Sequence, residues 1–243
     1  MMQEHGSNTV TVIVKKFTEN GVLSASDVVI VEYPLTIYVN DNEWITLFCS
    51  GNDQYYLSIG FMYSEGIIKT INDIDRWHLN EEEGKIYLYV NDNVFLRNKM
   101  KGKRTITTGC GKGTIFFDVL DALTTKPMNN NISISAESIV TKAAEFQKHS
   151  QLFVETGGVH ACALYSGNKM LYFHEDIGRH NALDKIIGQT LTSNKKIKNG
   201  WLLLSGRISS EIVIKASRLN IGLLLLCTHS KCNLSIGKAG CSS

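Results

Sequence analysis

The sequence predicts an α/β protein, α+β overall, in which a smaller β-rich N-terminal domain precedes a three-layer α/β domain. Two observations carry this prediction. Most of the first hundred residues alternate apolar and polar positions between turn clusters, whereas the second half alternates apolar strands with amphipathic helices. Such alternation is typical of a partly parallel sheet packed between helices. With 243 residues, 43% of them hydrophobic, the chain is long enough for one large domain or two modest ones.

The first part of the chain is expected to contain one helix among its strands. Strands are predicted at residues 9–17, 28–33, 35–39, 44–48 and 85–91. Pro34 separates the second of these from the third. The helix is expected over residues 53–63, with Asn52 or Asp53 as its N-cap, because apolar residues recur there at helical spacing. The β-rich domain is assigned to residues 1–117, ending in a glycine-rich loop that carries Cys110.

The second part begins with a connection at residues 118–131, where Pro127 interrupts any regular pattern. A helix follows over residues 136–149, and Ser135 is its expected N-cap. Further strands are predicted at residues 171–174, 201–204 and 221–227, and further helices at residues 177–191 and 208–219. The α/β domain is therefore assigned to residues 118–243.

Cys110 is the first candidate for chemistry. It lies between glycines in the segment Thr107–Gly113, which leaves it little side-chain cover. Its neighbourhood in the sequence is basic: Arg97, Lys99, Lys101, Lys103, Arg104 and Lys112. Nearby cations favour the thiolate, which is the nucleophilic form of cysteine. The sequence therefore predicts a reactive thiol, although a basic, solvated hairpin with an incidental cysteine is the alternative.

Composition limits which partners and which cellular compartment are expected. A formal net charge of +2 gives no strong bulk attraction to nucleic acid, so no nucleic-acid partner is expected. No apolar stretch reaches about 18 residues, so no membrane span is expected, and residues 1–7 do not resemble a secretion signal. Cys49, Cys162 and Cys227 lie in apolar runs and are expected to be buried thiols. Free thiols without a secretion signal favour the reducing cytoplasm.

Three polar or glycine-rich turns in the second half suggest an anion site, at residues 155–160, 175–181 and 205–209. Each is expected to follow a strand, which would bring the turns together at one edge of the sheet. Arg179 and Arg207 offer forked donors for phosphate or a guanine edge, and Asp176 could accept from guanine N–H groups. His160 and His180 could stack on a base, donate to a phosphate or transfer a proton. Ordinary turns, with Asp176 capping a helix and the histidines satisfied internally, are the alternative.

Zinc is the other ligand to weigh. His160-Ala161-Cys162 resembles the start of a deaminase motif but lacks its glutamate, and the spacing of Cys227, His229 and Cys232 fits no strong zinc pattern. No metal site is therefore expected.

Several segments together resemble the formate dehydrogenase accessory sulfurtransferase family, FdhD/NarQ. They are residues 32–35, 59–68, 107–114, 155–164, 175–188 and 205–207. The resemblance implies a larger domain similar to the cytidine-deaminase-like fold, without its zinc, and a homodimer. It implies a sulfurtransferase that carries persulfide sulfur from a cysteine desulfurase to the molybdenum or tungsten cofactor of formate dehydrogenase. Cys110 would be the catalytic residue.

The guanine end of the molybdenum guanine-dinucleotide cofactor would then account for the anion-binding turns. The residues expected to bind it are Thr156, Gly157, Gly158, His160, Asp176, Gly178, Arg179, His180, Asn181, Ser205 and Arg207.

Two departures from the family pattern leave alternatives open. Family members often carry Cys-x-x-Cys in the glycine loop, whereas the second position here is Gly113, so Cys110 alone must hold the sulfur. The segment Thr228–Ser243 also differs from the expected C-terminal segment, so that end of the domain is expected to be incomplete. The alternatives are a molybdenum-cofactor-binding chaperone without sulfur transfer, a zinc-dependent nucleoside deaminase, and a stable partner of the dehydrogenase that binds no nucleotide.

Overall fold

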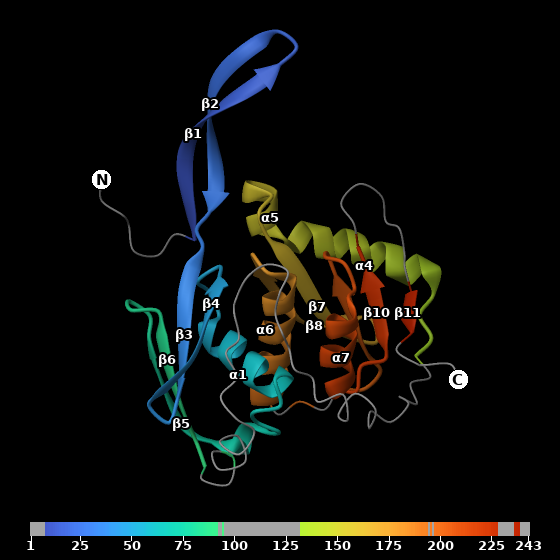
Figure 1. The fold of residues 1–243 in the computed structure, drawn as a ribbon. Coiled ribbons are helices and arrows are strands. Elements are labelled where there is room, and N and C mark those ends of the chain that lie inside the picture. The colour runs from blue at the N-terminus through green and yellow to red at the C-terminus, as the bar shows by residue number, and fades with distance from the viewer. Residues whose placement is uncertain are drawn as a thin grey trace.

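The computed structural model describes residues 8–91, 94, 132–193, 195, 197–227 and 236–238. The described strands are β1 (Thr9–Thr18), β2 (Gly21–Ile30), β3 (Tyr33–Val39), β4 (Asn42–Cys49), β5 (Ile74–Asn80), β6 (Lys85–Val90), β7 (His160–Ser166), β8 (Lys169–Asp176), β9 (Gly200–Leu204), β10 (Leu223–Leu226) and β11 (Ile236–Lys238). The helices are α1 (Gln54–Ser64), α4 (Ala136–His149), α5 (Gln151–Thr156), α6 (Arg179–Thr192) and α7 (Ser210–Arg218), with a 3-10 turn η1 (Ile71–Asp73). Figure 1 shows their arrangement.

The second half of the chain is a three-layer structure, and the predicted α/β fold is confirmed. Its sheet has the strand order β11-β10-β9-β7-β8, in which β9 and β10 are parallel and the other described pairings are antiparallel. Along β9, Leu202 and Leu204 face α6 and α7, whereas Trp201 and Leu203 face α4. A strand that is apolar at every position is thus covered on both faces.

The first half contains a smaller sheet with the order β4-β3-β6-β5, and α1 covers one of its faces. Leu35, Ile37, Ile86 and Leu88 are fully buried in this second core. One boundary prediction was wrong: Pro34 lies within β3 rather than between two strands. It stands next to the first residue of that strand, a position where a missing backbone donor costs little.

Helices α1 and α6 lie side by side between the two sheets (Figure 1) and meet at two glycines. A Cβ atom on Gly60 would overlap the carbonyl of Asp184, and one on Gly188 would overlap the carbonyl of Tyr56. The two backbones therefore touch directly, with no side chain between them. Any residue larger than glycine at either position would separate the helices.

Short elements account for most of the missed secondary structure. No strand or helix was predicted at β5, α5, β7 or β11, or over the first half of β2. The expected helix at residues 136–149 is α4 with the same ends, and Ser135 caps it by accepting from the N–H of Ser138 at 3.2 Å. Asp53 occupies the N-cap position of α1, but its side chain makes no capping bond there.

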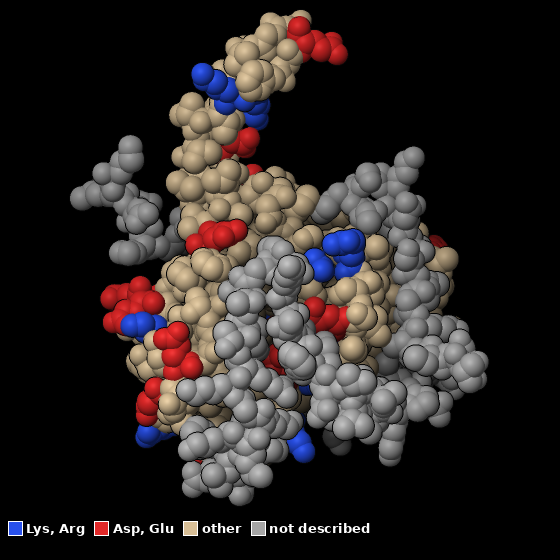
Figure 2. Space-filling view, viewed as in Figure 1, with Lys and Arg blue, Asp and Glu red and all other residues tan. Residues whose placement is uncertain are grey.

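Strands β1 and β2 form an arm that projects from the body of the molecule (Figure 1). They pair with each other over ten residue pairs in a separate two-stranded sheet. Large apolar side chains on the arm face solvent, including Ile13 at 77% and Phe17 at 81% exposure. In the space-filling view the arm is mostly uncharged (Figure 2). A two-stranded ribbon of this kind is marginally stable alone in water.

Some predictions fall on other parts of the chain. The connection at residues 118–131 and the boundary between residues 117 and 118 lie outside the described residues, so the domain division stays a prediction. Within the described residues, no helix has both the length and the apolar character needed to cross a membrane.

Candidate functional site

The three predicted turns meet at one edge of the large sheet. Ser205, after β9, donates its N–H to the carbonyl of Ala161 at 3.0 Å, and its Oγ accepts from the N–H of Ala161 at 2.8 Å. In the β7–β8 ladder, His160 pairs with Asp176. A Cβ atom on Gly206 would lie 3.0 Å from Cβ of Arg179 and 3.3 Å from Nδ1 of His160. Residues from all three turns are therefore neighbours.

The first turn reaches this edge in a different way from the one predicted. Thr156 is the last residue of α5, and Gly157 ends that helix with a φ of 63°, so the turn follows a helix and precedes a strand. The N–H of Gly158 donates to Oγ1 of Thr156 at 3.1 Å. A Cβ atom on Gly158 would lie 2.9 Å from Cγ2 of Ile30 at the base of the arm. The two glycines thus allow a tight turn and a close contact with β2.

Asp176 is enclosed rather than open to a ligand, so its predicted contact with guanine stays a prediction. It is 0% exposed, and its Oδ2 lies 2.7 Å from Nζ of Lys185. Oδ2 also accepts from the N–H of Ser50 at 3.2 Å and from its Oγ at 3.1 Å. Oδ1 accepts from the N–H of Gly178 at 3.1 Å and from Nδ2 of Asn181 at 2.8 Å. Both oxygens have partners inside the protein, so Asp176 shapes the turn.

Lys185 is the partner that the sequence analysis missed. Its ammonium is fully buried and also donates to Oγ of Ser50 at 3.0 Å, Oδ1 of Asn52 at 2.9 Å and the carbonyl of Glu175 at 2.9 Å. A buried ammonium needs such partners, since burial alone opposes its charge. The available signal was its place on the apolar stretch of α6, between Leu183 and Ile186.

A second buried ion pair lies on another side of α6. Oδ2 of Asp184 lies 2.6 Å from Nζ of Lys215 on α7. Oδ1 of Asp184 accepts from Oγ of Ser64 on α1 at 2.6 Å. Burial raises the pKa of Asp184, while Lys215 acts in the opposite direction. Consecutive residues of α6 therefore tie it to α1, to α7 and to the end of β8.

The start of α6 can receive an anion. Gly178 occupies the N-cap without any side-chain cap, and no acidic residue lies in the first turn. The free N–H groups and the dipole of a helix N-terminus favour negative charge. Nε of Arg179 is buried and has no hydrogen-bond partner among the described residues. Arg207 follows Ser205 and Gly206 in the sequence and is exposed. This cationic edge suits phosphate.

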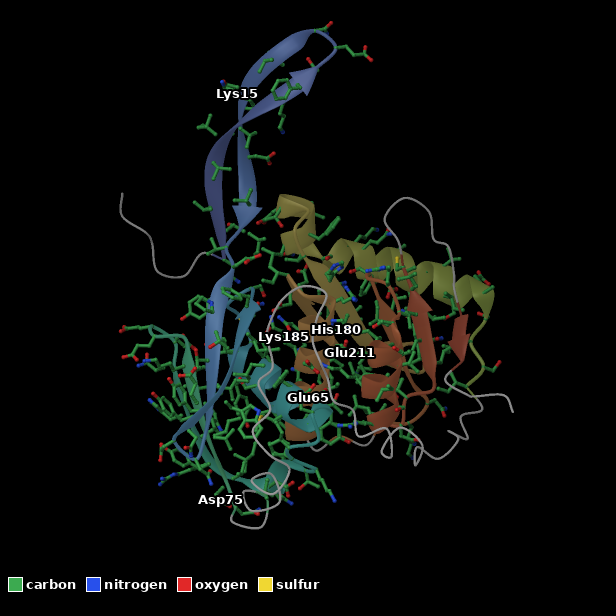
Figure 3. The ribbon with its side chains drawn as sticks, in the orientation of Figure 1. Lys15, Glu65, Asp75, His180, Lys185 and Glu211 are labelled. Carbon is green, nitrogen blue, oxygen red and sulfur yellow. The ribbon has the colours of Figure 1, made fainter. Side chains whose placement is uncertain are left out.

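His180 stands beside a carboxylate that the sequence analysis also missed. Its Nε2 lies 3.2 Å from Oε2 of Glu211 and 3.5 Å from Oγ of Ser209 (Figure 3). Burial, followed by the charges of Lys215, Arg179 and His160, lowers the pKa of His180 to about 4. Burial also raises the pKa of Glu211. The ring is therefore neutral at pH 7.

The described cysteines are structural, as predicted. Cys49, Cys162 and Cys227 are buried thiols that form no disulfide among the described residues. Burial raises the pKa of Cys49 to about 11 and raises that of Cys162 further. Such thiols are poor nucleophiles at neutral pH. Cys110, Cys232 and Cys241 lie outside the described residues.

Among the described residues, no group of three or more His, Cys, Asp or Glu side chains is arranged to hold a metal ion. His229 and Cys232 of the zinc alternative lie outside that part of the chain, so the expectation of no metal site stays a prediction.

Comparison with known proteins gives consistent matches. A model of the FdhD/NarQ family matches residues 30–232. A relative from Bacillus pumilus, named sulfur carrier protein FdhD, is 37% identical over 213 residues, which are 88% of this chain and 81% of the relative. A relative of the same name from Listeria innocua is 37% identical over 214 residues, or 87% of this chain and 82% of the relative.

One solved structure has the same fold. It is described as a "putative formate dehydrogenase accessory protein" from Desulfotalea psychrophila. The TM-score is 0.73 with 22% sequence identity, and the match covers 92% of this chain and 86% of the other.

The buried pair of Asp176 and Lys185 generates a stability prediction. Lys185→Met leaves a buried carboxylate without its counter-charge, and we expect it to lower the free energy of unfolding by about 3–5 kcal/mol in urea titrations. Asp176→Asn combined with Lys185→Met should recover much of that loss, because neither position then carries a charge.

Lys142→Met is the matched control, since it breaks an ion pair with Glu145 whose side chain is 43% exposed. We expect a loss below about 1 kcal/mol for this surface pair. Equal losses for Lys185→Met and Lys142→Met would contradict the assigned role of the buried pair.

Proposed function

The chain belongs to the FdhD/NarQ family, and we propose that it is a sulfur carrier that serves the maturation of formate dehydrogenase. In this proposal it is a sulfurtransferase that takes persulfide sulfur from a cysteine desulfurase and passes it to the molybdenum or tungsten cofactor of the dehydrogenase. The names of its relatives support the sulfur-carrier part, and family membership over residues 30–232 is the observation that carries it.

Cys110 is the residue we propose to hold the sulfur. The buried positions of Cys49, Cys162 and Cys227 support this choice, because a thiol that receives sulfur from a second protein must be reached by it. Cys110 also has the most basic sequence environment of the remaining thiols, which favours its thiolate.

The transfer step is an exchange between sulfurs. The thiolate of Cys110 attacks the outer sulfur of the desulfurase persulfide, a new S–S bond forms, and the bond inside the donor persulfide breaks. The desulfurase leaves as its cysteine thiolate, and the outer sulfur remains on Cys110 as a persulfide. No external oxidant or reductant is needed for this step.

The edge of the large sheet is where we propose that the guanine-nucleotide end of the cofactor binds. Support comes from the uncapped start of α6 and from the unpartnered Nε of Arg179. Arg179 and Arg207 hold phosphate in this proposal, with His160, His180 and Ser205 beside them. Asp176 and Asn181 act by fixing the turn, since their polar groups are used inside the protein.

A cofactor-binding chaperone without sulfur transfer is the second candidate. Gly113 favours it, because the loop lacks the second cysteine that many members of the family carry there. Both candidates use the same nucleotide site, so they differ only in whether Cys110 gains sulfur.

We expect the wild-type chain to gain one sulfur atom when it is incubated with a cysteine desulfurase and cysteine. Intact-mass spectrometry measures the gain, and peptide mapping assigns it to Cys110. Cys110→Ala should abolish the gain and leave the thermal unfolding curve unchanged.

Cys232→Ala and Cys241→Ala are the matched controls and should retain the added sulfur. Sulfur that survives in Cys110→Ala, carried by Cys232 or Cys241, would refute the assignment. Absence of any gain in the wild-type chain would favour the chaperone.

The nucleotide site gives a separate prediction. Arg179→Ala and Arg207→Ala should each weaken GDP binding by more than about 1 kcal/mol, because each removes a charge-assisted hydrogen bond to phosphate. Isothermal titration calorimetry measures the affinities. Arg76→Ala, on the exposed part of β5, is the control and should bind GDP like the wild type. Unchanged affinity in both Arg179→Ala and Arg207→Ala would remove this site from the proposal.

A second copy of the chain is the partner we propose for the arm. Ten residue pairs make a ribbon about 33 Å long and roughly 10 Å wide. Its two faces therefore offer on the order of 700 Å², close to the share of one partner in a stable interface. Reciprocal contact in a homodimer would cover both arms at once.

Light scattering coupled to gel filtration tests this interface. We expect the wild-type chain to have the mass of a dimer and Phe17→Glu to have the mass of a monomer, because the charge would be buried in the interface. Val140→Glu changes an apolar residue of α4 that is 54% exposed, and it should stay dimeric. A monomeric wild type, or a dimeric Phe17→Glu variant, would overturn the role of the arm.

A further inference from the structure

Glu211 and His180 form a polar pair that connects the starts of α6 and α7. Oε2 of Glu211 lies 3.2 Å from Nε2 of His180, and the two side chains are 28% and 26% exposed (Figure 3). Oγ of Ser209, the N-cap of α7, is 3.5 Å from the same ring nitrogen. All the described polar neighbours of the ring within hydrogen-bonding distance therefore lie at Nε2.

The charges around this pair keep the imidazole neutral. Lys215, Arg179 and His160 face His180 and disfavour a further positive charge, in addition to the effect of burial that lowers its pKa to about 4. Burial is the main cause of the raised pKa of Glu211, and the charges of Lys215, Asp184 and Arg179 also act on it. A neutral imidazole has one N–H donor and one acceptor nitrogen, so the position of the proton decides what the ring can bind.

A carboxylate beside Nε2 decides that position. The ionised form of Glu211 only accepts hydrogen bonds, so in this form it favours a proton on the nitrogen that faces it, whereas a protonated Glu211 would donate to that nitrogen. With Glu211 ionised, Nε2 carries the hydrogen, and Nδ1 keeps its lone pair. No described residue makes a hydrogen bond with Nδ1, so the described residues leave that acceptor unused.

We propose that Glu211 is a positioning residue that fixes the tautomer of His180, so that Nδ1 accepts a hydrogen bond from an N–H group of the bound guanine base. This inference rests on the nucleotide site proposed above and assigns one contact within it. The lone pair of Nδ1 repels phosphate oxygens, so the ring contacts the base and not the phosphates. Arg179 and Arg207 bind the phosphates. Recognition of base and phosphate is thereby divided between different side chains.

Long-range ¹H–¹⁵N NMR of the histidine rings tests the tautomer. At pH 7 we expect the signal of a neutral ring with its proton on Nε2. This signal should be absent in His180→Asn, and its absence there assigns it to His180. Glu211→Ala should convert His180 into a mixture of tautomers. Glu65→Gln is the matched control, because Glu65 shares Lys215 and Asp184 as neighbours with Glu211. It should leave the ring of His180 unchanged.

Binding of GDP and of pyrophosphate tests the division of recognition. Glu211→Ala should weaken GDP binding about fivefold, which equals about 1 kcal/mol, and should leave pyrophosphate binding unchanged. This selective loss is expected because pyrophosphate lacks the base.

Several results would overturn the inference. They are a cationic or Nδ1-protonated His180 at pH 7, an unaltered tautomer in Glu211→Ala, and an equal loss of pyrophosphate binding. A wild-type chain that binds pyrophosphate but not GDP would overturn the contact with guanine. A chain that binds neither would refute the nucleotide site of the previous section, and the NMR result would still decide whether Glu211 positions the ring.

Discussion

The buried ion pair between Asp176 and Lys185 is the constraint on which the candidate site depends. It joins the end of β8 to the middle of α6, and Ser50 extends it to the loop before α1. Because both charges are fully enclosed, neither can be satisfied by water if the other moves away. The turn between β8 and α6 is thereby fixed in one conformation, and with it the places where Arg179 and His180 leave the backbone.

Helix α6 belongs to both halves of the molecule. Its apolar residues fill the core of the large sheet, and Leu191 near its end also packs against the core of the small sheet. The charged side chains of Asp184 and Lys185 extend in different directions from the centre of this helix. Candidate site and fold are therefore specified by the same residues: the groups at the proposed anion-binding edge are held by those that join the two cores.

Local signals explain what could be predicted from the sequence. Apolar residues at helical spacing and the Ser135 cap define α4 within one segment, so no distant contact was needed to find it. The role of Asp176 could not be found in this way, because its partner Lys185 follows nine residues later and Ser50 precedes it by more than a hundred. The glycines at residues 157 and 158 indicated a turn correctly, but short α5 and the antiparallel β7 reversed the expected order of elements.

The glycine crossing of α1 and α6 has a mechanical consequence. Where side chains separate two helices, rotamer changes absorb small displacements, but here Gly60 and Gly188 leave backbone against backbone. The two helices must shift together as a stiff unit. A displacement of α6 at this crossing therefore moves α1, and with it the face of the small sheet that α1 covers.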